Sequence, residues 1–200
     1  MEILIIGGFL GSGKTTVIGK LLRGMVAEGE TVALIENEIG EVGIDDVFFE
    51  GAGLSVTPLF GGCVCCQISG SLLEATTNIQ DTISPDWLVI EMTGLAYMSD
   101  MRDLFKRYGR TGITVHTVSV LDSSRWPVLK LAMAHLVESQ LEDADVVLIN
   151  KTDVTPVTEA LTAEVTQLSG VAAILPISAT QENADLWRRL KDSRKTTGGQ

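Results

Sequence analysis

A glycine-rich motif near the start of the chain constrains the fold more strongly than any other feature of the sequence. Residues 8–15 read GFLGSGKT and fit the pattern G-x-x-x-x-G-K-[ST]. An apolar segment, residues 3–6, comes just before the motif, and a helical pattern that begins at Lys14 overlaps its end. Strand, glycine-rich loop and helix in this order are the context that separates a P-loop from a chance match. The sequence therefore predicts a strand–loop–helix unit that holds phosphate groups.

The chemistry of this loop follows from its residue types. Glycines let the backbone wrap closely around phosphates, so that successive N–H groups and the N-terminus of the next helix face the negative charge. Lys14 is expected to reach the β- and γ-phosphates, and the Thr15 hydroxyl is expected to bind Mg²⁺. A glycine-rich turn without a ligand is the alternative. The residues expected to bind the phosphates are Gly8, Gly11, Ser12, Gly13, Lys14, Thr15 and Thr16.

Apolar segments recur along the chain and predict the fold class. They are nearly continuous in Ile, Val and Leu, as in strands that are buried on both faces of a parallel sheet. Helical patterns lie between them, which favours a three-layer α/β P-loop fold with a mostly parallel central sheet flanked by helices. The predicted strands are 3–6, 32–36, 87–91, 115–121, 146–150 and 173–177, and the predicted helices are 14–28, 98–108, 127–138, 156–168 and 183–191.

Two segments depart from this alternation of predicted strands and helices. Residues 37–80 contain seven glycines and only short apolar runs, which predicts functional loops with some short strands. Residues 193–200 are polar and end in Gly-Gly-Gln, which predicts a flexible tail. A length of 200 residues suits a single domain. The predicted organisation is one nucleotide-binding domain over residues 1–192, followed by the tail.

A carboxylate follows the apolar run 87–90 in the segment Glu91-Met92-Thr93-Gly94. At the end of a strand, Glu91 can hold a Mg²⁺-bound water, and Gly94 can bring its N–H to the γ-phosphate. An acidic residue that caps the next turn is the alternative. Lys14, Thr15, Glu91 and Gly94 are thus the predicted catalytic residues, and Thr15 and Glu91 are the predicted Mg²⁺ ligands.

The segment Asn150-Lys151-Thr152-Asp153 follows another apolar strand and fits the N-K-x-D pattern with which P-loop GTPases read guanine. The Asp153 carboxylate can accept hydrogen bonds from the ring N–H and the exocyclic amine of guanine, whereas adenine offers neither donor. Asn150 is expected to support the loop or contact the guanine oxygen, and the stem of Lys151 is expected to lie over the ring. A chance turn, with Asp153 as a helix N-cap, is the alternative.

A second segment supports the prediction that the site binds guanine. Residues 176–180 read PISAT after the last predicted strand and resemble the Ser-Ala base loop of GTPases, which adds Ser178 and Ala179 to the predicted site. The P-loop, N-K-x-D and this loop occur in the order that a GTPase requires. The sequence therefore predicts GTP rather than ATP as the nucleotide.

Charge and cysteine placement exclude several classes of partner. A formal net charge of −11 repels a phosphate backbone, so nucleic acid is not an expected partner. No apolar run approaches the roughly 18 residues that a membrane span needs, so a soluble protein is expected. The three cysteines all lie within residues 63–66, too close together to cross-link distant parts of the fold. A reducing cytoplasm is therefore the expected location.

Five motifs together resemble one family. GFLGSGKTT, ENEIGEVGID, GGCVCC, EMTG and NKTD occur in the order seen in the CobW-type GTPases, relatives of the hydrogenase and urease nickel-insertion GTPases. The resemblance covers Met1 to about Leu190 and implies GTP hydrolysis coupled to handling a transition metal for a metalloprotein or a cobalt-containing cofactor. Larger members carry a C-terminal domain and often a His-rich stretch. With 200 residues and two histidines, this sequence resembles a short form without that domain.

Cys63, Cys65 and Cys66 match the C-x-C-C metal motif of the family. Thiolates are strong ligands for Zn²⁺ and other borderline or soft metals, and three of them can fill most of a tetrahedral shell. Glu36 or Glu38, after the second predicted strand, could complete the site in one nucleotide state and so couple metal affinity to hydrolysis. Reduced packing cysteines and a redox role are the alternatives. Zinc, cobalt and nickel all stay open.

The hypothesis for the mechanism is that Mg²⁺, Lys14 and the loop N–H groups neutralise charge developing on the transferred phosphoryl group. No Gln directly follows the Glu91 to Gly94 segment, so Glu41, Asp45 and Asp46 are the candidates for orienting the attacking water.

The expected partners are a transition-metal ion and an unidentified client metalloprotein or cofactor-assembly protein. Related GTPases pair face to face across their nucleotides, so the resemblance also implies a nucleotide-dependent homodimer. Two other functions stay open. One is a metal carrier whose nucleotide site is structural and barely hydrolyses GTP; the other is an ATP-using P-loop kinase, against which Asp153 argues.

Overall fold

One parallel sheet forms the centre of the molecule. The computed structural model describes residues 1–36, 54–58, 68–94, 97–170, 172–181 and 185–197. Seven strands lie in the order β3-β2-β4-β1-β5-β6-β7, and each neighbouring pair is parallel, which confirms the predicted sheet. The strands are β1 (Glu2–Gly8), β2 (Val32–Glu36), β3 (Leu54–Pro58), β4 (Trp87–Glu91), β5 (Thr114–Asp122), β6 (Val146–Asn150) and β7 (Ala173–Pro176).

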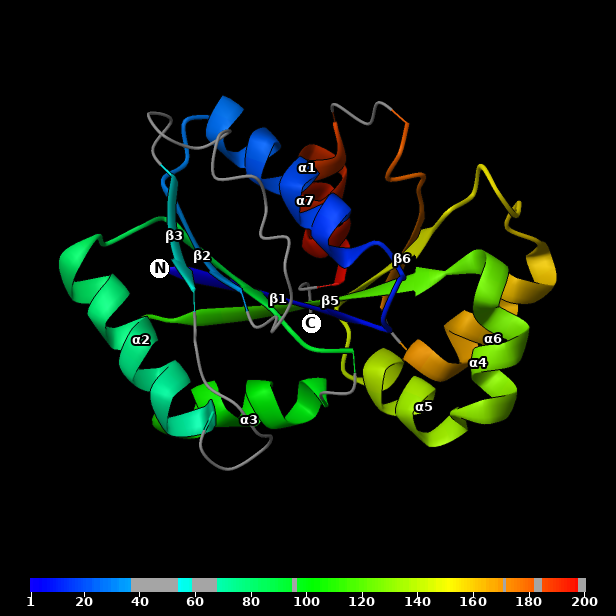
Figure 1. Ribbon diagram of the computed structural model, residues 1–200, viewed down its shortest axis with the longest axis horizontal. Coiled ribbons are helices and arrows are strands. Elements are labelled where there is room, and N and C mark those ends of the chain that lie inside the picture. Colours follow the sequence, from blue (N-terminus) through cyan, green and yellow to red (C-terminus); the bar gives the residue numbers. More distant parts are fainter. Residues whose placement is uncertain (37–53, 59–67, 95–96, 171, 182–184, 198–200) are drawn as a thin grey trace.

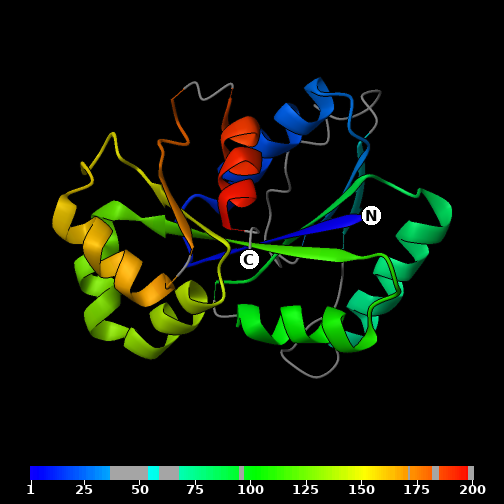
Figure 2. The same ribbon diagram turned by 180° about the vertical axis from the view of Figure 1, so that it is seen from behind.

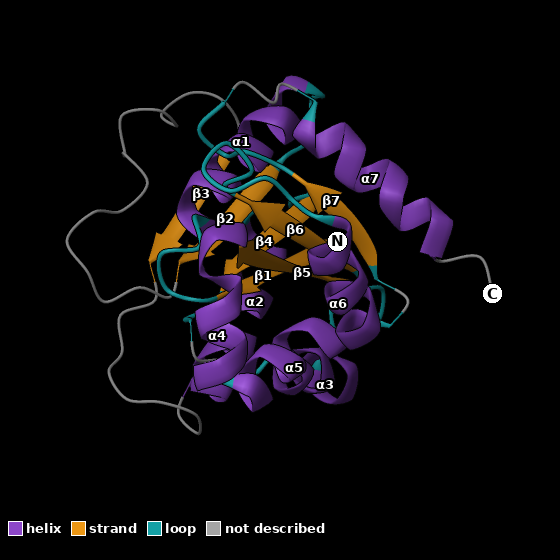
Figure 3. Ribbon diagram, turned by 90° about the vertical axis from the view of Figure 1, so that its right-hand side faces the viewer, coloured by secondary structure: helices purple, strands orange, loops and turns teal. Residues whose placement is uncertain are grey.

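Helices cover both faces of the sheet (Figures 1 and 2). Helices α1 and α7 lie together on one face, and α2 to α6 lie on the other, so that Figure 3 shows the three predicted layers. Among the described residues, no helix is both long and apolar enough to cross a membrane. The helices are α1 (Lys14–Ala27), α2 (Ile68–Thr82), α3 (Met98–Tyr108), α4 (Trp126–Ala132), α5 (Ala134–Glu142), α6 (Glu159–Ser169) and α7 (Leu186–Thr197), with a short 3₁₀ helix, η2 (Ser123–Arg125).

Strand β1 is buried on both of its faces. Successive side chains of a strand point to opposite faces of the sheet. Leu4 and Ile6 accordingly pack in the core beneath α1 and α7, whereas Ile3 and Ile5 pack in the core beneath α2 and α3. All four side chains are completely buried. This two-sided burial explains why β1 is apolar throughout rather than alternating.

The end of β1 lies where the order of the sheet reverses. Strand β1 pairs with β4 on one side and with β5 on the other. In open α/β sheets, ligands bind beyond the carboxyl ends of the strands at such a switch point. Because all strands are parallel, Gly8, Glu91, Asp122 and Asn150 end their strands at this same edge. The fold therefore gathers three predicted site residues, Gly8, Glu91 and Asn150, at one edge of the sheet, and Asp122, which was not predicted, lies with them.

One helix lies where the sequence predicted mainly loops. Helix α2 occupies Ile68–Thr82, within and beyond the predicted loop region 37–80, and β3 is one of its expected short strands. The helix buries Leu72, Thr76 and Ile79 at helical spacing. Thr76 is polar, so the apolar stripe is weaker in the sequence than in the structure. The prediction was wrong for residues 68–80 for this reason.

Three other helices differ from their predicted bounds. The predicted helix 127–138 is broken into α4 and α5 at Met133, whose φ of −138° and ψ of 38° are not helical. Helix α6 begins at Glu159, not at Pro156, because the Thr158 hydroxyl caps it by accepting the Leu161 N–H at 3.1 Å. Helix α7 continues to Thr197, so residues 193–197 of the predicted tail are helical.

Candidate functional site

The P-loop joins β1 to α1. Lys14 is buried, and its Nζ donates to the carbonyl oxygens of Gly8, at 3.0 Å, and Phe9, at 3.3 Å. The ammonium group therefore lies within the curve of its own loop. An ammonium that donates to carbonyl oxygens of its own loop can exchange these contacts for phosphate oxygens without leaving the loop.

Asn150 connects the P-loop with the base loops. It is 1% exposed, its Nδ2 donates to the Ser12 carbonyl oxygen at 2.8 Å, and its Oδ1 accepts the Ala179 N–H at 2.8 Å. Gly13 has φ of 94°, and a Cβ at this position would lie 2.4 Å from Asn150 Nδ2. Only glycine combines this backbone conformation with so close an approach. Two roles were expected for Asn150, support of the loop and contact with the guanine oxygen. Its hydrogen bonds in the structure fit the first role.

Lys151 makes a second connection. Its backbone has φ of 64°, and its Nζ donates to the Gly11 carbonyl oxygen at 2.7 Å and to Asp122 Oδ2 at 2.6 Å. The side chain thus crosses from the base motif to the P-loop. Asn150 and Lys151 together thus hold the predicted phosphate and base subsites at a fixed separation. That the Lys151 stem covers a guanine ring stays a prediction.

Asp153 is held by two hydroxyl groups of the segment 176–180. Its Oδ1 accepts from the Ser178 hydroxyl at 2.6 Å, and its Oδ2 accepts from the Thr180 hydroxyl at 3.2 Å. The hydrogen bond from Ser178, followed by one from backbone N–H, holds the pKa of the Asp153 carboxyl below its ordinary value. The side chain is therefore an ionised acceptor at neutral pH, as recognition of two guanine donors requires.

The predicted magnesium ligands lie next to each other. Glu91 is 2% exposed at the end of β4, and its Oε1 accepts from the Thr15 hydroxyl at 3.2 Å. Gly94 approaches the tip of the P-loop so closely that a Cβ there would lie 2.8 Å from the Leu10 nitrogen. The structure thus brings a hydroxyl, a carboxylate and the Gly94 backbone to the same loop. Hydroxyl and carboxylate oxygens are the protein ligands that Mg²⁺ prefers.

Asp122 is a site residue that sequence reasoning missed. It is 1% exposed, and besides Lys151 it accepts from the N–H and the hydroxyl of Ser124, at 2.9 and 2.6 Å. Burial raises the pKa of the Asp122 carboxyl, but the hydrogen bonds from Lys151 and Ser124 outweigh burial and leave the pKa below its ordinary value. The neighbouring Ser123 hydroxyl donates to the carbonyl oxygens of Lys151 and Thr155, at 3.2 and 2.9 Å.

A signal for Asp122 was present in the sequence. Asp122 ends an apolar strand and is followed by two serines, and in the sheet it pairs in register with Asn150. Polar residues at the carboxyl ends of adjacent parallel strands meet at one edge, so the order of the strands would have placed Asp122 beside the base motif.

The predicted transition-metal site lies mostly outside the described residues. Cys63, Cys65, Cys66 and Glu38 are in that part of the chain, and so are the water-orienting candidates Glu41, Asp45 and Asp46. Glu36 is described, is partly buried, and ends β2 at the edge of the sheet that also carries Glu91. Within the described residues, no group of three or more His, Cys, Asp or Glu is arranged to hold a metal ion.

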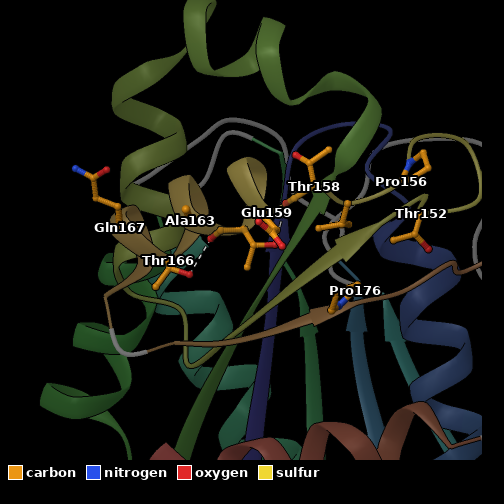
Figure 4. A pocket seen from close by; sticks show the side chains of 10 residues that line it. Thr152, Pro156, Thr158, Glu159, Ala163, Thr166, Gln167 and Pro176 are labelled. Atoms are coloured by element: carbon orange, nitrogen blue, oxygen red, sulfur yellow. Dashed lines mark hydrogen bonds between the residues drawn. The ribbon is translucent and has the colours of Figure 1, made fainter.

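A groove of about 900 Å³ lies beside the base motif (Figure 4). One wall is α6, where the Thr162 and Thr166 hydroxyls donate to the carbonyl oxygens of Thr158 and Thr162 in their own helix. Thr152 and Pro176 form part of the opposite wall. None of the predicted nucleotide-binding residues lines this groove, so it is separate from the predicted nucleotide site at the P-loop.

The order and geometry of these motifs have a counterpart in known proteins. Residues 2–177 match the nucleotide-binding domain of the CobW/HypB/UreG family. The chain belongs to this family. This is the family that the sequence resembles, and proteins similar to this chain include zinc chaperones and a Zn(II)-bound GTPase.

Two curated relatives are zinc chaperones. The zinc chaperone YjiA of Escherichia coli K12 is 29% identical over 190 residues, which cover 89% of this chain and 58% of YjiA. The zinc chaperone CobW of a Sinorhizobium species is 31% identical over 179 residues, which cover 74% of this chain and 50% of that protein. The chain therefore spans about half to three-fifths of the length of these relatives.

Solved structures agree with the fold. The crystal structure of the Zn(II)-bound YjiA GTPase superposes with a TM-score of 0.67 and 27% identity, over 93% of this chain and 59% of that chain. The hydrogenase maturation factor HypB of Archaeoglobus fulgidus superposes with a TM-score of 0.69 over 96% of this chain and 89% of that chain. Its identity of 18% supports the fold alone.

Proposed function

We propose that this chain binds Mg²⁺ and GTP, hydrolyses GTP, and couples hydrolysis to the binding or delivery of a transition metal for a metalloprotein or a metal cofactor. The observation that carries the proposal is the joint between the P-loop and the N-K-x-D motif, in which Asn150 binds the Ser12 carbonyl and Lys151 binds the Gly11 carbonyl. This joint fixes phosphate and base subsites relative to each other, as a guanine nucleotide requires.

Selection of guanine is proposed for Asp153. Its ionised carboxylate is oriented by Ser178 and Thr180, and it would accept from the ring N–H and the exocyclic amine of the base. An adenine there would leave a fixed carboxylate unpaired, which weakens binding by several-fold to several hundred-fold. Competition between GTP and ATP for the site tests this assignment and separates it from an ATP-using kinase.

In the hydrolysis step we assign Lys14 and the loop N–H groups to the developing charge on the phosphoryl oxygens. Thr15 and Glu91 fit Mg²⁺ as oxygen ligands that lie within one hydrogen bond of each other, and the ion would add positive charge beside the phosphates. Gly94, which contacts the tip of the P-loop, would turn its N–H toward the γ-phosphate. The residue that orients water is proposed from Glu41, Asp45 or Asp46.

We place the metal cargo on Cys63, Cys65 and Cys66, with Glu36 or Glu38 as a fourth ligand. The zinc chaperone relatives support a metal of this class. However, a YjiA variant in which one glutamate and two cysteines are replaced by alanine is also Zn(II)-bound, so bound zinc alone does not locate the site. A test must therefore show that the cysteines of this chain are required. A reducing cytoplasm, a client protein and a nucleotide-dependent homodimer belong to the same proposal.

The deciding experiment is calorimetric titration of Zn²⁺, Co²⁺ and Ni²⁺ into reduced protein that carries GDP or a non-hydrolysable GTP analogue. We expect tight binding that depends on the nucleotide and is lost in the Cys65→Ala, Cys66→Ala double variant. Absence of binding in both nucleotide states would remove the metal function and leave the GTPase. Binding that survives in the double variant would move the metal to other residues.

Phosphate release under steady-state conditions, with and without metal, tests the coupling. We expect slow turnover of GTP that changes when metal is added and is abolished in Lys14→Ala. If metal binds but GTP is not hydrolysed under any condition, the chain is a metal carrier with a structural nucleotide site.

A further inference from the structure

Gln140 is a polar side chain in an apolar environment. It belongs to α5 and is 1% exposed, between Val137 and Leu141, which are buried to the same extent. Val137 and Leu141 pack in the core cluster that also contains Phe9 of the P-loop. A leucine or methionine would satisfy the packing requirement at this position, so the amide group calls for an explanation.

The amide of Gln140 is only half satisfied. Its Nε2 donates to the Gly94 carbonyl oxygen at 3.0 Å, whereas its Oε1 is buried and has no hydrogen-bond partner among the described residues. The orientation is fixed by chemistry, because a carbonyl oxygen can only accept and the reverse orientation would oppose two acceptors. A buried amide oxygen without a partner destabilises the folded state. Gln140 therefore retains its donor at the expense of stability.

Gly94, whose carbonyl oxygen accepts this hydrogen bond, lies between the predicted magnesium ligands and the tip of the P-loop. The Met92 N–H still bonds to the Ile6 carbonyl at 2.9 Å, as a continuation of the sheet, but Gly94 lies beyond this contact. Gly94 packs on the Leu10 nitrogen, three residues after Glu91, which is itself bonded to Thr15. Gln140 thus connects α5 to the turn that joins the magnesium ligands to the tip of the P-loop.

We propose that Gln140 is a positioning residue that holds the Glu91–Gly94 turn against the P-loop, and that it thereby favours binding of a nucleoside triphosphate over the diphosphate. The inference rests on the proposed binding of GTP. The hydrogen bond holds the Gly94 carbonyl, which belongs to the peptide plane after Gly94, whereas the N–H that would face the γ-phosphate belongs to the plane before it. Gln140 would therefore act on this N–H by anchoring Gly94 in its position against the Leu10 nitrogen. The diphosphate lacks the group with which this turn would interact.

The test is the substitution Gln140→Met, which keeps the volume and removes both the donor and the acceptor of the side-chain amide. We expect unchanged or increased thermal stability, unchanged GDP affinity, and binding of a non-hydrolysable GTP analogue that is about five- to tenfold weaker, the value of one hydrogen bond. Ser139→Ala is the matched control, because this neighbour on α5 donates only to the Leu136 carbonyl of its own helix. Affinities are measured by calorimetry in the presence of Mg²⁺.

A purely structural role gives a different pattern. It would lower thermal stability and weaken both nucleotides to the same extent, and this result, or no change in either affinity, would overturn the proposal. If wild-type protein binds neither nucleotide, the proposed GTP function fails instead, so the two failures are distinguishable.

A second variant covers the case in which Gln140→Met does not fold. Gln140→Glu keeps the shape, and only its protonated form has a donor for Gly94. Its preference for the GTP analogue over GDP, relative to wild type, should therefore increase as the pH falls from 8 to 6. A relative preference that stays constant over this range would contradict the proposal.

Discussion

Lys151 shows how single residues are held in this site. A non-glycine residue with positive φ is uncommon and persists where its surroundings fix it. The Ser123 hydroxyl binds the backbone carbonyl of Lys151, and the Asp122 carboxylate binds its ammonium group. The contact of Lys151 with Gly11 in the P-loop thus depends on Asp122, which ends β5, and Ser123, which begins η2, and neither belongs to a nucleotide-binding motif.

We expect Asp122→Ala to lower the unfolding free energy by about 2 kcal/mol, the value of a buried hydrogen bond to a charged group. Because Lys151 holds the P-loop at the Gly11 carbonyl, we expect the affinities for GDP and for a GTP analogue to fall together, by about tenfold. Urea unfolding and calorimetry measure the two effects. Ser124→Ala is the control, since it removes one donor to Asp122 and leaves Lys151 bound. Equal effects of the two substitutions would show that Lys151 does not need Asp122.

The site residues that the sequence could predict are those that lie close together in short motifs. Asn150, Asp153, Ser178 and Ala179 belong to short motifs, and the structure brings all four together. Gln140 bonds to a carbonyl 46 residues away, and no local pattern distinguishes it from any other glutamine. The roles of Cys63, Cys65 and Cys66 stay predictions, because these residues lie outside the described part of the chain.

Strands and helices were predictable where their buried residues form a continuous apolar pattern in the sequence. The six predicted strands are all present, because each reads as an apolar run. Five of them are largely buried, and β7, at the edge of the sheet, packs partly buried side chains against the core on both of its faces. Helix α2 buries a threonine within its apolar stripe, and α4 and α5 are separated by a single residue without glycine or proline. Such features follow from tertiary packing, which local propensity does not encode.

The contact between α1 and α7 gives a prediction for these two elements. A Cβ at Gly24 of α1 would lie 2.6 Å from the Cβ of Trp187 in α7, whereas a Cβ at Gly19 would meet only the end of the Arg23 side chain, at 3.8 Å. We expect Gly24→Ala to destabilise the protein by about 1–3 kcal/mol, because the helices must separate. Gly19→Ala should stabilise it by up to about 1 kcal/mol through helix propensity.

Urea unfolding followed by circular dichroism compares these two glycine variants. The two substitutions make the same chemical change in the same helix, so their difference isolates the packing against α7. Stabilisation by both alanines would mean that α7 does not press on α1 at Gly24.

At the scale of the whole molecule, stability depends on ionised carboxylates throughout the fold. The chain carries a formal net charge of −11, yet several carboxyl groups gain hydrogen bonds on folding that hold their pKa below the ordinary value. These groups are Asp81, Asp86, Asp122, Asp153 and Glu164. A group whose pKa is lower in the folded state stabilises it fully above the ordinary value, and this contribution is lost as the pH falls through the folded value.

Asp86 allows this dependence to be measured away from the nucleotide site. It accepts the Thr31 hydroxyl at 2.7 Å and the Thr31 N–H at 2.8 Å, and these two bonds, in that order, lower the pKa of its carboxyl from an ordinary value of 3.8. Both bonds end on the same oxygen, Oδ2, so the amide oxygen of Asn could still accept them, but a neutral oxygen accepts more weakly than a carboxylate. We therefore expect Asp86→Asn to have a lower urea midpoint than wild type at pH 7.

Below about pH 4 the unfolded wild-type chain takes up a proton at Asp86 before the folded chain does, so the advantage over Asp86→Asn should shrink as the pH falls further. Urea midpoints of both proteins at pH 7, 5, 4 and 3 provide the test. A difference that stays constant over this range would mean that Asp86 acts through its shape and not through its charge. Nucleotide affinity should be unchanged in this variant, because Asp86 precedes β4 at the edge of the sheet opposite to Glu91.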